Sequence, residues 1–348
     1  MATSANPKDS IKSTWRQADR STWSFPHKLI DLVNIHHVDL NKEVPVHEKT
    51  DKVPDLVQWP LHVWILIHSF IPLLLQQAWA HYTGQNLSSI AAFFLYHEAF
   101  HYDSIREVHI LRRLGHIYGF FDGDKHERDG VPDASVGKVV ESLISTIVFR
   151  PLILVLFSYK PELLPSSINW KWLPLEIALY SIVLDFWFYW YHRLMHDVGP
   201  LWKFHRKHHL TKHPNPLLTI FADTEQEIGD LVGIPLMTFF TLRLMGLPMG
   251  FYEWWICVKY VLFAEIFGHS GLRIHSIMPS TATWLLTPLG ASIAVEDHDL
   301  HHRKGWRKSH NYGKQTMLWD RIFGTYHDRL ESTEQNIDYS DRVVFPFF

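Results

Sequence analysis

Eight histidines in the C-terminal half of the chain recur at spacings that suit metal binding. His192 and His196 stand four residues apart in WYHRLMH, so on an α-helix both imidazoles leave one face. Two later segments, WKFHRKHH and VEDHDLHH, repeat the pattern H-x-x-H-H and contribute His205, His208 and His209, and His298, His301 and His302. Adjacent histidines on a helix diverge by about 100°, which suits ligands that reach two neighbouring metals.

The number of these histidines favours a pair of redox metals. Neutral imidazole binds Fe, Zn, Cu or Ni, and eight ligands exceed what one ion can hold. A structural zinc ion closes with four ligands and a catalytic one uses three. The excess therefore favours two metals, with iron preferred. The chain has 25 histidines, so a single box arises easily by chance, and the whole set carries the prediction.

Two alternatives compete with this interpretation. His97-Glu98-Ala99-Phe100-His101 matches H-E-x-x-H, the signature of a zinc metalloprotease, here one in a membrane. No third ligand follows it convincingly, and it leaves the eight patterned histidines unexplained. A metal transporter would place its site near the bilayer midplane on broken helices. The patterned histidines lie instead beside basic loops at the ends of apolar segments, which favours a catalytic head.

Six apolar stretches must position these histidines. They are Leu61–Ala80, Leu87–Phe100, Val139–Tyr159, Leu173–Tyr191, Leu231–Leu247 and Phe251–Phe267. A membrane-spanning helix needs about 20 apolar residues, and several of these stretches are shorter or carry polar residues. Basic residues crowd the loops at 106–128, 203–212 and 303–308, which predicts that these loops are cytosolic. We therefore expect an all-α, polytopic membrane protein with about four transmembrane helices and a cytosolic helical cap that holds a dimetal site.

Composition and charge narrow the remaining classes. A net charge of −3 gives no sign of nucleic-acid binding, and the single cysteine, Cys257, excludes a disulfide framework or a site of several thiolates. No signal peptide is readable in the polar N-terminal segment. We expect four regions: a polar arm at 1–60, membrane helices with a connecting loop at 61–172, a catalytic domain at 173–330 and a tail at 331–348.

The histidine boxes resemble those of the fatty acid hydroxylase superfamily, which includes C-5 sterol desaturases and C-4 methylsterol monooxygenases. The segments YWYHRLMH, KFHRKHH, FGHSG, EDHDLHH and NYGKQTMLWDRIFGTY follow one another with that family's spacing, over roughly Leu173 to Tyr326. Residues 1–150 look more like a fungal branch of the superfamily. The resemblance adds His269 and His275 to the metal ligands and leaves His213 and His310 outside them.

The resemblance implies a membrane-bound, non-haem enzyme with two Fe ions. It would use O2 to hydroxylate, or desaturate, a C–H bond of a lipid-like substrate such as a sterol, a fatty acyl chain or a fungal terpenoid or polyketide. We expect it in the endoplasmic reticulum membrane with its site facing the cytosol. Neither a His-Pro-Gly-Gly haem segment nor a flavin-type glycine-rich loop is readable, so electrons are expected from a separate b-type cytochrome or NAD(P)H reductase.

Acidic residues near the histidine boxes are candidates for orienting the metal ligands. Asp185 lies seven residues before His192, two helical turns away on the same face of an apolar helix. A carboxylate in such a helix is costly, so it either orients a ligand imidazole through the other ring N–H or ties two helices together. Glu296, Asp297 and Asp299 flank the third box and offer the same orienting role. Substrate is expected to reach the site from membrane lipid, through a pocket walled by aromatic residues of the helices ending at Tyr191 and Phe267.

Overall fold

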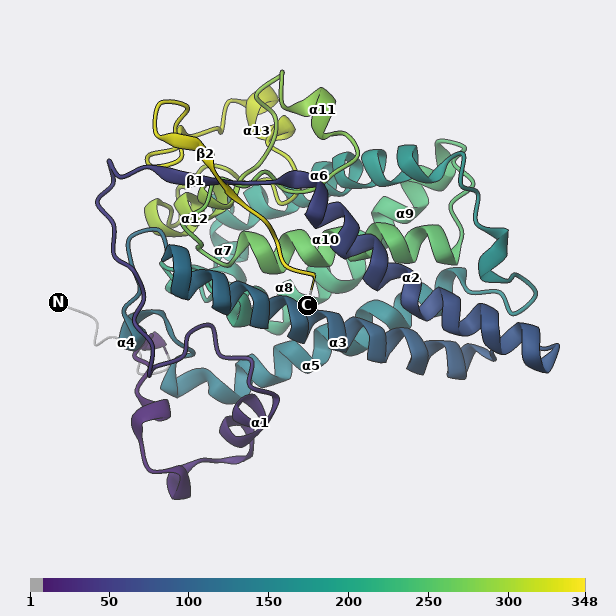
Figure 1. The fold of residues 1–348 in the computed structure, drawn as a ribbon, viewed down its shortest axis with the longest axis horizontal. Coiled ribbons are helices and arrows are strands. Elements are labelled where there is room, and N and C mark those ends of the chain that lie inside the picture. The colour runs from purple at the N-terminus through teal and green to yellow at the C-terminus, as the bar shows by residue number, and fades with distance from the viewer. Residues whose placement is uncertain (1–8, 348) are drawn as a thin grey trace.

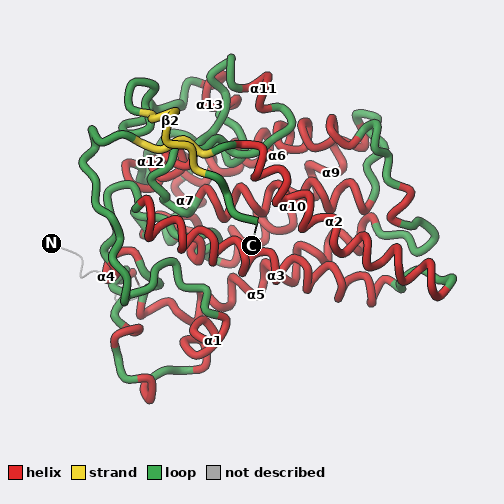
Figure 2. The backbone as a smooth tube through the Cα atoms, in the orientation of Figure 1, coloured by secondary structure: helices red, strands yellow, loops and turns green. Residues whose placement is uncertain are grey.

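The computed structural model describes residues 9–347, and most of the chain is helical (Figures 1 and 2). The helices are α1 (Phe25–Val33), α2 (Gln58–Thr83), α3 (Ser89–Tyr118), α4 (His126–Asp129), α5 (Val136–Ser158), α6 (Leu173–Asp197), α7 (Gly199–His205), α8 (Thr224–Ile228), α9 (Ile234–Leu244), α10 (Phe251–Gly268), α11 (Thr283–Leu286), α12 (Val295–Lys304) and α13 (Leu318–Phe323). The two strands are β1 (Val53–Leu56) and β2 (Ile337–Val343). The predicted all-α class is confirmed.

Helix α10 forms the centre of the fold. All 18 of its residues are buried, and it packs against α2, α3, α5, α6 and α12. Its first turn is fixed by Glu253, whose carboxylate accepts the backbone N–H of Gly250 at 3.1 Å. Lys259 and Glu265 are buried on this helix in ion pairs with Asp103 and Arg150. Because protein rather than lipid surrounds it, α10 provides a rigid axis whose C-terminal end leads into His269.

Three helices within residues 9–347 are long and apolar enough to cross a membrane, rather than the four expected. They are α2, the segment His126–Ser158 that contains α5, and α6. The other apolar stretches differ for local reasons. Leu87–Phe100 continues into the charged half of α3, and Leu231–Leu247 is divided between a π-helical turn at Gly229–Gly233 and the short α9. The stretch Phe251–Phe267 is the protein-covered α10.

The N-terminal arm and the C-terminal tail, expected as separate regions, form one small sheet. Strand β1 pairs in parallel with β2, with Val53 opposite Ile337 and Leu56 opposite Val343. The backbone of His275 lies on the other side of β1: its N–H donates to Pro54 at 2.8 Å, and its carbonyl accepts from Leu56 at 2.9 Å. The two ends of the chain therefore hold the segment that follows α10.

The helices that carry the histidine boxes begin and end where local chemistry requires it. Pro174 lies in the first turn of α6, where a missing N–H costs nothing. Helix α12 starts at Val295, because Asp297 accepts the backbone N–H of Ala294 at 2.7 Å. Helices α7 and α12 lie near one another at one end of the bundle (Figure 1). The histidine-bearing elements therefore gather at one end of the long helices.

Candidate metal centre

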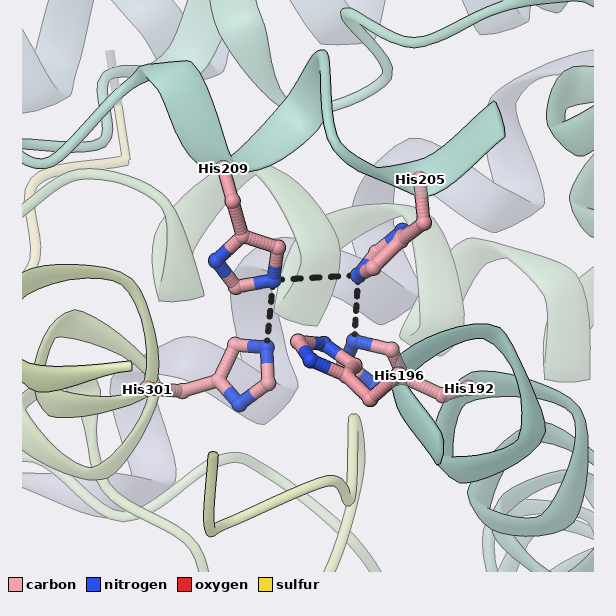
Figure 3. Close-up of side chains that lie close together, drawn as sticks. All are labelled: His192, His196, His205, His209 and His301. Atoms are coloured by element: carbon pink, nitrogen blue, oxygen red, sulfur yellow. Dashed lines mark hydrogen bonds between the residues drawn. The ribbon is translucent and has the colours of Figure 1, made fainter. Parts of the chain in front are cut away.

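Nine of the ten predicted histidine ligands lie in two adjacent groups. The five-histidine group consists of His192 and His196 from α6, His205 from α7, His209 from the following 3-10 turn, and His301 from α12 (Figure 3). The four-histidine group consists of His208, His269, His298 and His302. Within each group the ligand nitrogens lie within 4.8 Å of one another. The sequence neighbours His208 and His209, and likewise His301 and His302, are divided between the groups, as their divergence on a helix requires.

All nine side chains are buried, and burial keeps them neutral. The pKa of His205 is lowered to about 3 and that of His269 to about 4, in both cases chiefly by removal from water. Burial likewise lowers the pKa values of His209 and His301 well below the ordinary value. Neutral imidazole is the form that binds a metal, so these rings are ready as ligands at physiological pH.

The five-histidine group is oriented through the Nδ1 atoms of four rings. Nδ1 of His192 lies 2.9 Å from the carbonyl of Tyr312, Nδ1 of His196 lies 2.8 Å from that of Trp306, and Nδ1 of His301 lies 2.6 Å from that of His310. Nδ1 of His205 lies 2.8 Å from the side-chain oxygen of Gln226. A carbonyl can only accept, so each Nδ1 carries the proton and each Nε2 carries a lone pair. In the four-histidine group, Nδ1 of His269 and His302 donate in the same way to Glu265 and Thr211.

The inward-facing nitrogens fit metal ions better than they fit one another. Nε2 of His205 lies 3.0 Å from Nε2 of both His192 and His209, and Nε2 of His209 lies 3.0 Å from that of His301 (dashed lines in Figure 3). Two lone pairs at this distance repel unless a cation lies between them. Two nitrogens bound at right angles about 2.1 Å from one ion are about 3.0 Å apart. The buried Nε2 atoms of His196 and His302 have no hydrogen-bond partner among the described residues. The two groups can therefore bind metal.

Asp185 acts on a backbone loop and not on an imidazole. Its carboxylate accepts the backbone N–H groups of Lys314 and Gln315 at 3.0 and 2.8 Å, and also that of Thr316. This loop contains the Tyr312 carbonyl that orients His192. Asp185 therefore does not orient an imidazole directly, which was the first predicted role. It does tie two elements together, which was the second, but it joins a helix to a loop and not a helix to a helix. Asp320 holds the same loop by accepting the N–H of Tyr312 at 2.8 Å.

His275 lies outside both groups. Its Nδ1 is 2.8 Å from Asp55 of β1, so its side chain faces the sheet formed by the two chain ends. The strand pairing of its backbone fixes this direction. The carboxylates beside the third box also have other partners: Glu296 accepts from the backbone at Leu330–Ser332, Asp297 binds Arg329, and Asp299 binds Arg303. His213 lies near Asp122, and the ring of His310 stacks on His327.

The H-E-x-x-H segment does not form a metal site in the structure. Nδ1 of His97 lies 3.1 Å from the adjacent Glu98, whose side chain is 69% exposed. Within residues 9–347, neither group of potential metal ligands contains His97, Glu98 or His101. The structure therefore gives no support to a metalloprotease, and the buried end-of-helix position of the nine histidines does not resemble a midplane transport site.

Gln226 is the main site residue that sequence reasoning missed. It lies on α8, in a segment that has no histidine pattern, and its amide group bridges His205 and Asp230. The carbonyls of Trp306, His310 and Tyr312 were equally hidden, because a backbone acceptor leaves no residue-type signal. The only hint in the sequence was the closeness of residues 306–312 to the third box.

A cavity of about 290 Å³ lies beside the metal centre, and its walls are aliphatic. It is lined by residues of α1, α3, α5 and α10 and by the segment 216–220, including Leu29, Ile105, Val140, Ile147, Leu217 and Leu262. The hydroxyls of Ser104, Thr146 and Thr219 in its wall each donate to a carbonyl of their own turn or helix. This cavity lies between α3, α5 and α10, and not between α6 and α10, where an aromatic pocket was expected. Its lining includes Glu265 and Ile266, about one helical turn before His269.

The amino-acid sequence of the chain is similar to those of known proteins. The sequence model of the fatty acid hydroxylase family matches residues 177–325, which include all nine clustered histidines. A fatty acid hydroxylase, vlmA, from Lecanicillium sp is 42% identical over 316 residues, which cover 87% of this chain and 86% of that protein. The chain belongs to the fatty acid hydroxylase family. Like the hydroxylases, monooxygenases and desaturases among its relatives, this family member is an oxidoreductase.

More distant relatives of this family member bear other names. A methylsterol monooxygenase 2-2 from Arabidopsis thaliana is 26% identical over 278 residues, covering 78% of this chain and 98% of that protein. A Delta(7)-sterol-C5(6)-desaturase from Nicotiana tabacum is 29% identical over 168 residues, covering 48% of this chain and 55% of that protein. No solved structure matches the chain. The predicted membership of the fatty acid hydroxylase superfamily is confirmed.

Proposed function

We propose that this chain is a membrane-bound, non-haem di-iron oxygenase that hydroxylates an unactivated C–H bond of a lipid. The single observation that supports this most strongly is the pair of buried groups of five and four histidines, each with its nitrogens aimed at one centre. Bound iron would supply the activation of O2 and the removal of hydrogen from the substrate. One C–H bond, one O2, two electrons and two protons give one alcohol and one water. Loss of a second, neighbouring hydrogen gives an alkene and two waters.

The chain's own residues orient the ligands and keep the centre dry. The Nδ1–H bonds to carbonyls fix ring tautomer and direction, and such outer bonds also raise the basicity of the ligand nitrogen. Burial of all nine rings excludes bulk water, which protects a reactive oxidant from side reactions. Asp185 and Asp320 hold the loop that carries the Tyr312 carbonyl, so they stabilise the orientation of His192 at a distance.

The aliphatic cavity is the proposed binding site for the substrate. It has the size of a small-molecule pocket at the lower end of the usual range. Its aliphatic wall and its contact with α10 one turn before His269 suit an unbranched hydrocarbon chain. Ile147→Trp should shorten the longest substrate accepted, whereas Leu156→Trp, exposed on the same helix, should not.

We place the enzyme in the endoplasmic reticulum membrane with the histidine end of the bundle in the cytosol. Three apolar helices support membrane insertion, and the basic segments around the histidine boxes support the orientation by the positive-inside tendency. Electrons come from a separate b-type cytochrome or NAD(P)H reductase. Turnover of the purified protein with NADPH and O2 alone would contradict this last point.

Metal analysis with Mössbauer spectroscopy of anaerobically purified protein tests the proposal. We expect about two iron ions per chain and O2-dependent formation of a hydroxylated or unsaturated lipid. One zinc ion per chain and no iron in active material would show that the di-iron assignment is wrong.

A further inference from the structure

A cluster of unpaired cations lies on the surface next to the five-histidine group. Lys203 on α7 and Lys304, Arg307 and Lys308 at and after the end of α12 are exposed, and none forms an ion pair with any residue in the range 9–347. The protein as a whole carries a net charge of −3, so this positive charge is local. We call these four residues and Trp306 the basic face.

Trp306 connects the basic face to the metal ligands. It is 39% exposed, so a partner protein can touch its ring, and its carbonyl lies 2.8 Å from Nδ1 of His196. Its ring centroid is 5.1 Å from that of Trp202, and Trp202 is 5.2 Å from the ring of His196. The surface and the five-histidine group are thus joined by one hydrogen bond and by two short steps between aromatic rings.

The aliphatic cavity touches other residues than the basic face does. The aliphatic cavity reaches α10 one turn before His269, which belongs to the four-histidine group. The basic face adjoins His196 and His301 of the five-histidine group through residues 303–310. Electron transfer slows steeply with distance, so a carrier gains most by binding where a ligand lies one residue from the surface.

We infer that the basic face is the docking surface of an acidic one-electron carrier that contains a b-type haem. The inference rests on the proposed function, because the carrier supplies the two electrons that the proposed reaction consumes together with O2. Two carrier molecules would bind in turn, and each ferrous haem would become ferric and give up one electron beside Trp306, which the metal held by the five-histidine group would accept. The two protons come from water. Opposite charges steer such a partner and accelerate its association, most strongly at low ionic strength.

Binding of a defined probe to the iron-loaded enzyme in lipid nanodiscs tests the surface. The probe is the soluble, acidic haem domain of a microsomal b-type cytochrome, with the basic cytochrome c for comparison. Lys304→Glu with Lys308→Glu should weaken binding of the acidic probe about tenfold at low salt, and high salt should remove the difference. Lys160→Glu with Lys171→Glu is the matched control, since both lysines are exposed in the connection between α5 and α6 and the change in net charge is the same.

A second measurement tests the entry point. In stopped flow, Trp306→Leu should slow oxidation of the bound ferrous haem at least fivefold without changing affinity, and Trp306→Phe should restore most of the rate. The carbonyl of residue 306 remains in both variants, so iron content should not change. A rate in Trp306→Leu equal to that of the unaltered enzyme would overturn Trp306 as the entry point.

Chemical reduction separates this inference from the proposed function. With dithionite as the electron source, the charge variants should turn over as the unaltered enzyme does. Equal weakening by both charge pairs, or tighter binding of cytochrome c than of the acidic probe, would overturn the docking surface. Absence of iron, or of any product with dithionite and O2 in the unaltered enzyme, would instead overturn the proposed function.

Discussion

The two histidine groups differ in what surrounds them. The five-histidine group has four Nδ1 atoms anchored to acceptors and lies beside an exposed tryptophan. The four-histidine group has one ligand fewer, and His269 and His298 line a small cavity of about 10 Å³. That is about the smallest space that holds one water-sized molecule. The cavity lined by His269 and His298 thus leaves room for a small molecule beside the four-histidine group. In the proposed function, this group is the one nearer the substrate, and the five-histidine group is the one nearer the electron donor.

The largest effects should come from removing one ligand of each group. His301→Ala should empty the five-histidine group and His302→Ala the four-histidine group, each lowering iron from about two to about one per chain. Activity should fall in both by more than the 10–100-fold typical of outer partners. Nitric oxide, an O2 analogue, should still bind in His301→Ala and not in His302→Ala, as followed by electron paramagnetic resonance. The reverse pattern would mean that the five-histidine group, and not the four-histidine group, binds the small molecule. His97→Ala serves as the control and should keep both irons.

Gln226 should produce the next largest effect, confined to the five-histidine group. Gln226→Leu removes the acceptor of the His205 Nδ1–H and should weaken iron binding there about 10–100-fold. Gln226→Glu keeps an acceptor and should retain most of the metal. Iron content after dialysis against a graded chelator measures both. Equal loss from the two groups would mean that they are not independent.

The stability of the metal-free protein should depend on pH through the histidines of both groups. The pKa of His205 is about 3 and that of His269 about 4 in the folded state, against about 6.5 in the unfolded chain. Between these values the unfolded state binds the extra protons. The contribution of these two histidines to stability is therefore constant above pH 6.5, and it falls as the pH drops toward 4, by about 1.4 kcal/mol per pH unit for each histidine. Thermal unfolding at pH 7.5 and 5.5 checks this, and an unchanged Tm would contradict it.

Asp185 should show a smaller effect that reaches only the five-histidine group. Asp185→Asn leaves one oxygen for three backbone N–H groups and should cost about 1–3 kcal/mol of stability. It should also broaden the spectroscopic signal of the iron bound by His192 and leave the other iron unchanged. Denaturant unfolding and Mössbauer spectra together measure this. A signal change at the four-histidine group alone would contradict the conclusion that this loop orients His192.

The smallest effect is expected at His275. His275→Leu removes the hydrogen bond to Asp55 and should cost about 1 kcal/mol, with no loss of iron from either group. Metal analysis of the variant distinguishes this from the ligand role that the family resemblance implied. Loss of one iron would restore His275 as a ligand.

The sequence was most informative where side-chain type and helical spacing act together. Spacing on a helix brought His192 to His196 and separated His208 from His209, because helix geometry alone fixes those directions. It failed at His275, since a strand formed by two distant chain ends decides where that ring points. It also missed Gln226, because its partner is set by tertiary packing. The apolar stretch of α10 carries three charged residues, Glu253, Lys259 and Glu265, and only its surroundings show that protein covers the whole helix.

The pairing of β1 with β2 has a consequence for how the enzyme matures in the cell. The carbonyl of His310, the brace from Asp320 and the strand at Ile337–Val343 all come late in the chain. During synthesis, His192 to His209 leave the ribosome long before those acceptors exist. We therefore expect the ligand orientations to be complete only after residues through Asp320 have been made, so that iron binds to both groups after most of the chain has been synthesised. The sheet that holds the segment around His275 forms later still, once Val343 has been added.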